Sequence, residues 1–450
     1  MDASVGANEG AGPFEVTHRL VLSIAIPMTL GFLTTPLLGL TDTAVAGRLG
    51  SADALAGLAV GAVLFDLILG SFNFLRASTT GLVAQAFGRG DRSEEQAIFW
   101  RSLAIAICCG LLIALASPLL LKAGLMLMAP PPGVAEATIT YFAIRILAGP
   151  MALANYAILG FVLGRGQGTT GLLLQAIING MNITLSIVLG LGYGWGVAGI
   201  AIGALIGETT GMLVGLVLVL YRFQRADRPP KGSIFAVVRM KALFALNRDI
   251  MIRTFVLLAA FTLMTRIGSS FGPLALAANA VLMNIFLVAG YYLDGLANAA
   301  EQIVGRAIGA DYRPAFDRAV RLTMVWSFGM GAATALLFLI VGTDIIALLT
   351  TTESVRAEAA SYLPWAALTA ITGALAFQMD GVYIGATWSR TMRNMMLMAF
   401  LGYLAALVIF VPLFGNHGLW LSLNLFLAFR GVFLAARVPK LARQIFRPAQ

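Results

Sequence analysis

The chain has 450 residues, of which 59% are hydrophobic and only 11% are charged, and its mean hydropathy is +0.88. Soluble domains carry about 25% charged residues, so this composition excludes a soluble enzyme, a disordered chain and a soluble nucleic-acid-binding protein. The formal net charge is +9, but the basic residues lie between apolar segments, which is the pattern of a membrane protein rather than of a nucleic-acid-binding surface.

The first 17 residues contain no Lys or Arg and therefore lack the basic segment that opens a secretory signal. We expect them to form a short cytoplasmic tail, followed by an apolar segment that is retained as a membrane span. A spanning helix needs about 20 mostly apolar residues. Twelve segments meet this requirement, and they begin near Leu20, Ala54, Ile98, Ala137, Leu172, Val197, Ile250, Ala275, Ala319, Tyr362, Met392 and Gly418. The sequence therefore predicts an all-α polytopic membrane protein with twelve transmembrane helices.

The basic residues between these segments predict how the chain is oriented. If the N-terminus and the even-numbered loops share one face, that face holds 23 of the 30 Lys and Arg residues and the opposite face holds 4. Cytoplasmic loops are enriched in Lys and Arg. We therefore expect a multi-pass protein in the lipid bilayer of the cell inner (plasma) membrane, with both termini in the cytoplasm.

The chain divides into two similar halves around a basic connection. Residues 48–64 and 266–282 match at eight of 17 positions, which indicates an internal repeat. Each half has an even number of helices, so the sequence predicts two six-helix lobes related by a parallel pseudo-two-fold repeat, with a substrate cavity between them. The predicted boundaries are 1–17 for the N-terminal tail, 18–221 for the N-lobe with helices 1–6, 222–249 for the cytoplasmic linker, 250–438 for the C-lobe with helices 7–12, and 439–450 for the C-terminal tail.

Ionisable side chains inside membrane spans are costly, and each is a candidate for function. Asp42 follows a long apolar run, and Pro27 and Pro36 in the same helix can kink it. A carboxyl on a kinked helix beside a cavity can take up or release a proton. In the repeat Asp42 aligns with Ala260, so structural symmetry does not explain this acid. The alternative is an aspartate at a helix end near the outer surface, paired with Arg48.

Two helices carry stripes of polar residues. Gln175, Asn179, Asn182 and Ser186 share one face of the fifth helix, and Asn284, Tyr291, Asp294, Asn298 and Glu301 share one face of the eighth. Amides can hydrogen-bond a carboxyl in either protonation state, whereas the alternative for the fifth helix is contact between helices. The two carboxylates of the eighth helix indicate an aqueous cavity able to hold a cation or protons, although Glu301 could also be a solvated helix end.

Three further polar residues lie inside spans. Asp380 in the tenth helix aligns with Leu159 in the repeat, and Glu208 lies in the middle of the sixth helix. Either acid could form a buried pair with an arginine (Arg145, Arg266 or Arg430), and for Glu208 we favour that structural role. Asn155 is a candidate for lining a cavity or for structural packing.

The sequence contains no catalytic, cofactor or metal motif. No Walker phosphate loop is present, so ATP is not expected as the energy source. His18 and His417 lie far apart in the chain and near helix ends, and the adjacent Cys108 and Cys109 are read as apolar fillers. We therefore expect a protein that is not an enzyme and that holds neither a cofactor nor a metal.

Several motifs together resemble the multidrug and toxic compound extrusion (MATE) family, and most closely its bacterial DinF-like branch. The resemblance covers nearly the whole chain, in order. It is carried by Pro36-Leu37-Leu38-Gly39-Leu40-Thr41-Asp42-Thr43-Ala44-Val45, Ser78-Thr79-Thr80-Gly81-Leu82-Val83-Ala84-Gln85-Ala86-Phe87-Gly88, Asn247-Arg248-Asp249-Ile250-Met251, Asn279-Ala280-Val281-Leu282-Met283, Leu293-Asp294-Gly295, Met379-Asp380-Gly381-Val382-Tyr383-Ile384-Gly385-Ala386-Thr387 and Gly415-Asn416-His417.

The resemblance implies a two-lobed exporter that alternates between inward-open and outward-open forms and expels amphipathic, often cationic compounds in exchange for protons or sodium. Asp42 matches the acid of the first helix, whose protonation bends that helix, and Asn182 matches an amide near it. Ser186 departs from the family, because many members have an aspartate there. Asp380 matches an acid implicated in cation coupling in sodium-driven relatives. Their glutamate in the seventh helix has no clear counterpart in residues 253–265, which favours protons.

The leading hypothesis is a proton-coupled antiporter for small amphipathic or cationic compounds, which we expect to act as a monomer. Asp42 would carry the proton with Asn182 and Ser186 beside it, and Pro27 and Pro36 would let the helix bend. The residues expected to line the substrate cavity are Asn155, Asn179, Asn279, Asp294, Asn298 and Asp380. The alternative is a flippase for lipid-linked precursors of the same superfamily, which would need a cationic groove for phosphates. An intramembrane enzyme and a passive channel are less consistent with these residues.

Overall fold

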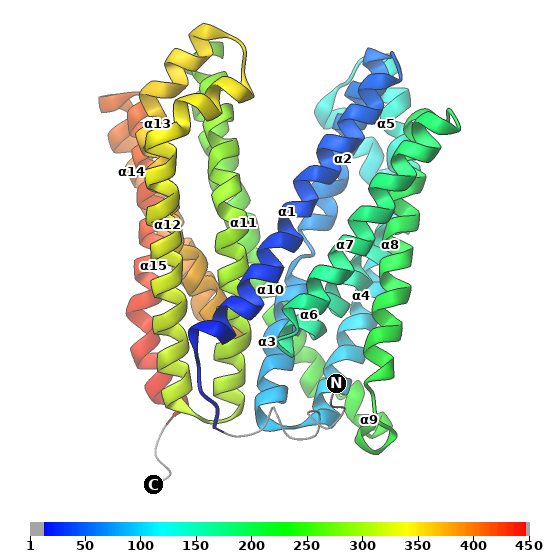
Figure 1. The fold of residues 1–450 in the computed structure, drawn as a ribbon, viewed down its shortest axis with the longest axis vertical. Coiled ribbons are helices and arrows are strands. Elements are labelled where there is room, and N and C mark those ends of the chain that lie inside the picture. Colours follow the sequence, from blue (N-terminus) through cyan, green and yellow to red (C-terminus); the bar gives the residue numbers. More distant parts are fainter. Residues whose placement is uncertain (1–12, 447–450) are drawn as a thin grey trace. The chain divides into compact units, whose positions relative to one another are not determined.

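The computed structural model describes residues 13–446, and the chain in that range is helical with no β-strand (Figure 1). Twelve of its helical segments are long and apolar enough to cross a membrane. This confirms the predicted all-α protein with twelve transmembrane helices. The helices are α1 (His18–Arg48), α2 (Ala52–Gly70), α3 (Phe74–Arg89), α4 (Arg92–Met128), α5 (Pro132–Arg145), η1 (Ile146–Ala148), α6 (Gly149–Gly164), α7 (Gly168–Ile187), η2 (Val188–Gly192), α8 (Gly196–Tyr221), η3 (Arg225–Asp227), α9 (Lys231–Ile234), α10 (Val237–Ser269), α11 (Pro273–Gly309), α12 (Arg313–Leu349), α13 (Glu353–Gly385), α14 (Ser389–Phe414) and α15 (Asn416–Ile445).

The chain folds into two compact units. The unit that we call the N-terminal unit comprises Leu30–Phe87 and Asp91–Leu243, and the C-terminal unit comprises the chain up to Thr29, Gly88–Gly90 and the chain from Phe244 onward. Helices α1 and α10 therefore each contribute residues to both units. Helix α10 begins at Val237, well before the span expected near Ile250, because the amphipathic end of the predicted linker continues into the apolar segment as one helix.

Three spans of the N-terminal unit are interrupted. A short turn joins α2 to α3, the 3₁₀ turn η1 joins α5 to α6, and α7 continues as the π-helical segment η2. Pro150 at the start of α6 explains the second interruption, because proline lacks the N–H that a continuous α-helix would use. Departures from α-helical geometry within a helix frequently mark functional sites, and two of these interruptions adjoin the site described below.

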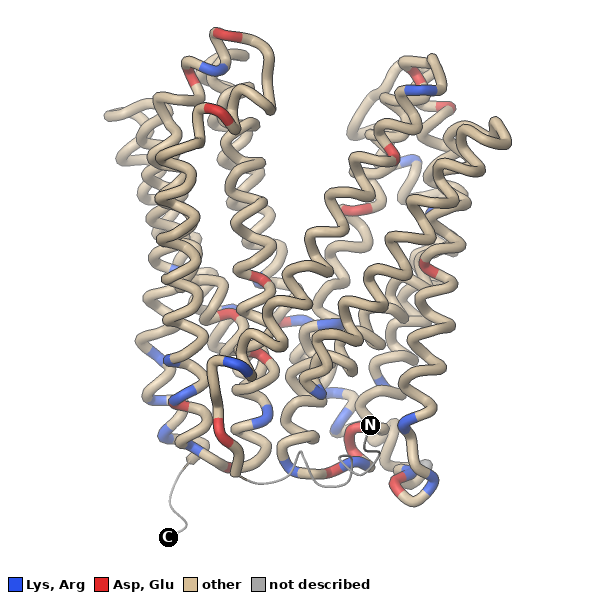
Figure 2. Tube along the Cα trace, viewed as in Figure 1, with Lys and Arg blue, Asp and Glu red and all other residues tan. Residues whose placement is uncertain are grey.

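Contacts with α4 hold the middle of the predicted linker on the N-terminal unit. Glu94 on α4 accepts a hydrogen bond from Arg101 at 3.0 Å and pairs with Arg239 on α10. The Arg101 Nε atom also donates to the carbonyl oxygen of Ile234 at 2.6 Å. Within each unit, most Lys and Arg residues lie toward one end of the helices (Figure 2). The cytoplasmic location of that end remains a prediction.

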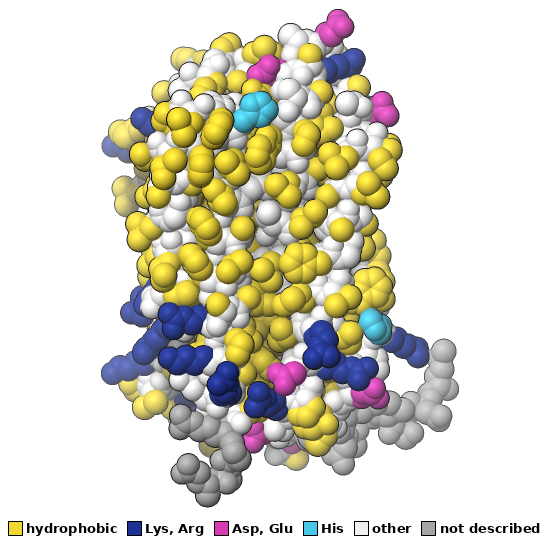
Figure 3. All heavy atoms as spheres, turned by 90° about the vertical axis from the view of Figure 1, so that its left-hand side faces the viewer, with side chains coloured by type: hydrophobic (Ala, Val, Ile, Leu, Met, Phe, Trp, Pro, Cys, Tyr) yellow, Lys and Arg dark blue, Asp and Glu magenta, His cyan; other side chains and the backbone are white. Residues whose placement is uncertain are grey.

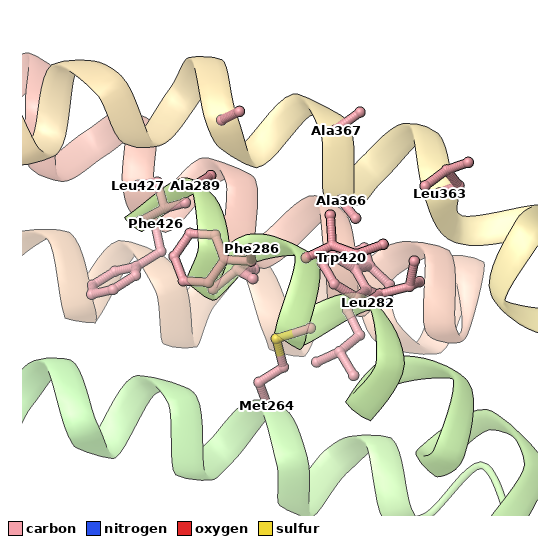
Figure 4. Close-up of a cluster of buried hydrophobic side chains, with 14 of the residues drawn as sticks. Met264, Leu282, Phe286, Ala289, Leu363, Ala366, Ala367, Trp420, Phe426 and Leu427 are labelled. Carbon is pink, nitrogen blue, oxygen red and sulfur yellow. The ribbon is translucent and has the colours of Figure 1, made fainter. Parts of the chain in front are cut away.

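The core of the C-terminal unit is formed by α10, α11, α12, α13, α14 and α15. Trp420 on α15 is fully buried among aliphatic and aromatic side chains of these helices (Figure 4). Between helices in a bilayer, such contacts stabilise mainly through van der Waals packing, because lipid tails are as apolar as the side chains themselves. The labelled members of this core are Met264, Leu282, Phe286, Ala289, Leu363, Ala366, Ala367, Trp420, Phe426 and Leu427.

The outer surface of the C-terminal unit is apolar over its middle, and Lys and Arg gather nearer one end (Figure 3). Large apolar side chains such as Leu336 and Ile340 on α12 and Leu401 and Val408 on α14 are more than half exposed. A continuous apolar surface of this kind is costly in water and is the surface that a lipid bilayer requires.

Close packing of α11 against α13 gives a first prediction. A Cβ atom added to Gly381 would lie 2.2 Å from the carbonyl oxygen of Ala297, so Gly381→Ala must push α13 away from α11. We expect this substitution to lower the free energy of unfolding in detergent by about 1–3 kcal/mol. The control is Gly373→Ala on the same helix, where the nearest atom is 3.8 Å away. Equal losses in the two variants would contradict this account of the helix packing.

Candidate functional site

Asp42 lies at the centre of a polar site in the N-terminal unit. Its carboxyl is half-buried on α1 and faces the hydroxyl of Ser186 on α7. Ser186 Oγ lies 3.1 Å from Asn182 Oδ1, one helical turn away, and both of these α7 side chains are buried. The structure therefore brings together the three residues that the sequence associated with the proton.

Asn179, one turn earlier on α7, contacts α1 directly. Its Nδ2 atom donates to Thr34 Oγ1 at 2.6 Å, and Thr34 in turn donates to the carbonyl oxygen of Gly31 at 2.6 Å. Helix α1 remains helical through Pro27 and Pro36. Asn179 thus fixes α7 to the part of α1 that contains Pro36 and precedes Asp42.

Arg145 supplies the positive charge of the same site. It is the last residue of α5 before the η1 turn, and its guanidinium lies 3.8 Å from Glu208 on α8 and 4.1 Å from the centre of the Phe65 ring on α2. It also lies close to Tyr141 on the same helix, and its charge acts on Asp42. The expected pairing of Glu208 with an arginine is confirmed, and its structural role remains a prediction.

Asn155 on α6 holds Glu208 in place. Its Nδ2 atom donates to Glu208 Oε2 at 2.8 Å and to the carbonyl oxygen of the same residue at 3.0 Å. Asn155 is a buried residue, and the partner of its side chain is Glu208, an acid of this site. Lining of a substrate cavity by Asn155 remains a prediction.

Asp66 on α2 and Tyr141 on α5 were missed in the sequence analysis. Asp66 lies within the apolar run Phe65-Asp66-Leu67-Ile68-Leu69, and the charge of Arg145 acts on it. An acid inside a membrane span is the signal that identified Asp42, and the same signal identifies Asp66. Tyr141 gives no comparable signal, because tyrosine is common in membrane helices.

Asp380 belongs to a separate buried cluster in the C-terminal unit. It lies on α13 and forms ion pairs with Arg253 on α10 and Arg430 on α15. Arg430 is only 1% exposed, and the charge of Asp294 on α11 also acts on it. Arg253 lies within the spanning helix α10, which begins at Val237, so it is placed inside the C-terminal unit and not in the connection between the two halves.

The other predicted residues of the C-terminal unit lie on α11. The buried side chains of Asn279 and Asn416 exchange two hydrogen bonds, at 2.8 and 3.0 Å, and Trp420 Nε1 donates to Asn279 Oδ1 at 2.8 Å. Asn298 Nδ2 donates to the backbone carbonyl oxygen of Asp294 at 2.7 Å, and the Asp294 side chain is exposed. Asn279 therefore joins α11 to α15, whereas Asp294 and Asn298 lie together one turn apart.

Comparison with known proteins agrees with this architecture. A family model described as MatE matches residues 27–188 and again residues 250–411, which supports the internal repeat. The chain is 36% identical over 429 residues to the DNA damage-inducible protein F of Escherichia coli (strain K12), covering 93% of this chain and 92% of that protein. It is 25% identical to the probable multidrug resistance protein NorM of Agrobacterium fabrum, covering 100% of each chain.

The fold is also that of solved MATE structures. A crystal structure of MATE in the bent conformation superposes with a TM-score of 0.86 at 17% sequence identity, covering 96% of this chain and 97% of that one. The family model covers most of the chain. More than a third of the aligned residues are identical between this chain and the relative from Escherichia coli, and the alignment spans nearly the full length of that relative. The resemblance seen in the sequence motifs is therefore confirmed, and the chain belongs to the multidrug and toxic compound extrusion (MatE) family.

Proposed function

We propose that the chain is a secondary active exporter of small amphipathic, cationic compounds, coupled to proton antiport through Asp42. The observation that carries this proposal is the contact of the half-buried Asp42 carboxyl with the Ser186 hydroxyl, beside a buried guanidinium. A carboxyl in a membrane span can exchange a proton for a cation at one position, so that the two compete. The NorM relative is named a probable multidrug resistance protein, which agrees with the export of drugs.

Ser186 gives the site a means of responding to protonation. A hydroxyl has one proton to donate, and the distance from Ser186 Oγ to Asn182 Oδ1 is 3.1 Å. When Asp42 is protonated, Ser186 can accept its proton while donating to Asn182. When Asp42 is ionised, Ser186 is better placed as a donor to the carboxylate, and the bond to Asn182 is lost. The serine that replaces the family's common aspartate thus keeps a response to the charge of Asp42 without a second carboxyl.

Helix α1 offers a route from this local change to movement. Asn179 holds Thr34 on α1, and Pro36 leaves a backbone carbonyl without its usual intrahelical partner. A change in the contacts of Asp42 therefore acts on a helix that bends at low cost. The relative crystallised in a bent conformation is consistent with such a movement in this fold.

The contacts of Asp380 favour protons over sodium. Two guanidinium groups already neutralise this carboxyl, so a sodium ion would have to displace at least one of them. No ion pair among the residues that the structure describes includes Asp42, so this carboxyl remains available to a proton or an organic cation. All the residues of the proposed site come from one chain, so a monomer is sufficient, and the excess of basic residues supports cytoplasmic termini.

Flux measurements in proteoliposomes test the proposal. We expect ethidium, an amphipathic monocation, to move against an imposed proton gradient and to respond weakly to an equal sodium gradient. Protein-free liposomes control for passive movement of the dye. Transport driven by sodium at constant pH, or flux that is independent of both gradients, would contradict proton antiport.

A further inference from the structure

Asp66 is a carboxyl in the middle of a membrane span, and the mechanism above does not use it. It lies within the span Ala52–Arg89, between apolar neighbours, and its side chain is exposed whereas Phe65 is buried. None of the ion pairs found within residues 13–446 includes Asp66. A charged carboxyl at this depth is costly against lipid tails, so such a residue is expected to face a water-filled or polar space.

The surroundings of Asp66 place it in the same polar site as Asp42. The adjacent Phe65 ring packs 4.1 Å from the guanidinium carbon of Arg145. The charge of Arg145 acts on both Asp42 and Asp66, and the charges of these two acids both act on Tyr141. The two carboxyls therefore lie on different helices, α1 and α2, around one guanidinium.

The site carries more negative than positive charge. Asp42, Asp66 and Glu208 are acids, and Arg145 is the buried base that acts on all three. The remaining groups are the phenols Tyr141 and Tyr156, with Arg76 acting from the start of α3 on Tyr156. Arg145 is also committed to another contact, because it pairs with Glu208. Even with Arg76 counted, two guanidinium groups cannot neutralise three carboxylates.

We propose that Asp66 is a second cation-contacting residue of this site, and that the pair Asp42 and Asp66 selects amphipathic dications. The inference rests on the proposed function and adds a substrate class to it. A dication can place one charge near each carboxyl, whereas a monocation leaves one of the two carboxyls without a partner. In a low-dielectric site the charge left without a partner weakens binding.

Binding of two matched dyes tests this inference. Ethidium and propidium share the phenanthridinium ring, but ethidium carries one positive charge and propidium carries two. Titration of the purified full-length protein with each dye, followed by fluorescence, gives their ratio of affinities. We expect Asp66→Asn to lower the propidium-to-ethidium affinity ratio about tenfold, while the affinity for ethidium changes by less than about threefold. Asp66→Glu should keep most of the preference, because it keeps the charge.

The control variant is Asp53→Asn, which removes the same charge from the first turn of the same helix. It should leave the ratio unchanged. A ratio that Asp66→Asn does not change, or an equal loss of both dyes in that variant, would overturn the role of Asp66 while leaving the role of Asp42 intact. If wild-type protein binds neither dye, the proposed cationic substrates fail, and this inference fails with them.

Discussion

Replacing Asp42 with asparagine is expected to remove the coupling of transport to a proton gradient. The amide keeps the size of the side chain and can still hydrogen-bond with Ser186, but it cannot take up or release a proton. We therefore expect folded protein in which the response of ethidium flux to an imposed pH gradient falls on the order of a hundredfold, the upper part of the range for coupled sites. Flux measurements on reconstituted wild-type and Asp42→Asn protein check this result.

The same variant predicts a change in the pH dependence of binding. An ionised Asp42 attracts a cation, and a protonated Asp42 does not, so proton and substrate bind in competition. Lowering the pH should therefore weaken the binding of ethidium to wild-type protein, and by linkage the binding of ethidium should release protons. In Asp42→Asn protein both effects should be lost.

Asp42→Glu is the matched control, because it restores a carboxyl at the same position. It should recover part of the pH dependence, whereas Asp53→Asn, in the first turn of α2, should behave as wild type. If Asp42→Asn protein retained the wild-type pH dependence of both binding and flux, Asp42 would not be the proton carrier. A flux lost in every variant, including Asp53→Asn, would instead indicate damage to the fold.

The spans were predictable because a bilayer imposes a local rule on the sequence. Each spanning helix needs its own long apolar run, and the structure has twelve such segments within the described residues. The start of α10 was not predictable in this way. Its first turns are amphipathic and contain Arg239 and Lys241, so hydropathy detects the apolar part of the helix and not its polar beginning at Val237.

In the candidate site, contacts within one helix were predictable from the sequence, whereas contacts between helices were not. Asn182 and Ser186 are four residues apart on one helix, so the helical period alone places them in contact. The partners of Asp380 lie on two other helices, and no local rule selects Arg253 and Arg430 from the remaining arginines. Asp66 was predictable but was missed, because the rule that an acid inside a membrane span is a candidate for function applies to it as well as to Asp42.

Among the substitutions considered, we expect Asp380→Asn to cause the largest loss of stability, because Asp380 lies in a cluster of paired charges. Asp380→Asn leaves the buried Arg430 and the half-buried Arg253 without the carboxylate that pairs with both. Breaking a buried ion pair from one side costs about 3–5 kcal/mol, because the remaining charge has lost its compensation. We expect the variant to lose that much free energy of unfolding, measured by denaturant unfolding in detergent micelles.

The structural interpretation of this cluster can be separated from a role in coupling. If the cost arises from uncompensated guanidinium groups, the double variant Asp380→Asn with Arg430→Met should be more stable than Asp380→Asn alone, because one buried charge has been removed with little change in volume. Arg430→Met alone should cost less than Asp380→Asn, since Arg253 still pairs with the acid. The folded fraction of Asp380→Asn protein should keep the wild-type pH dependence of ethidium flux. Loss of that pH dependence without loss of stability would show that Asp380, and not only Asp42, takes part in carrying protons.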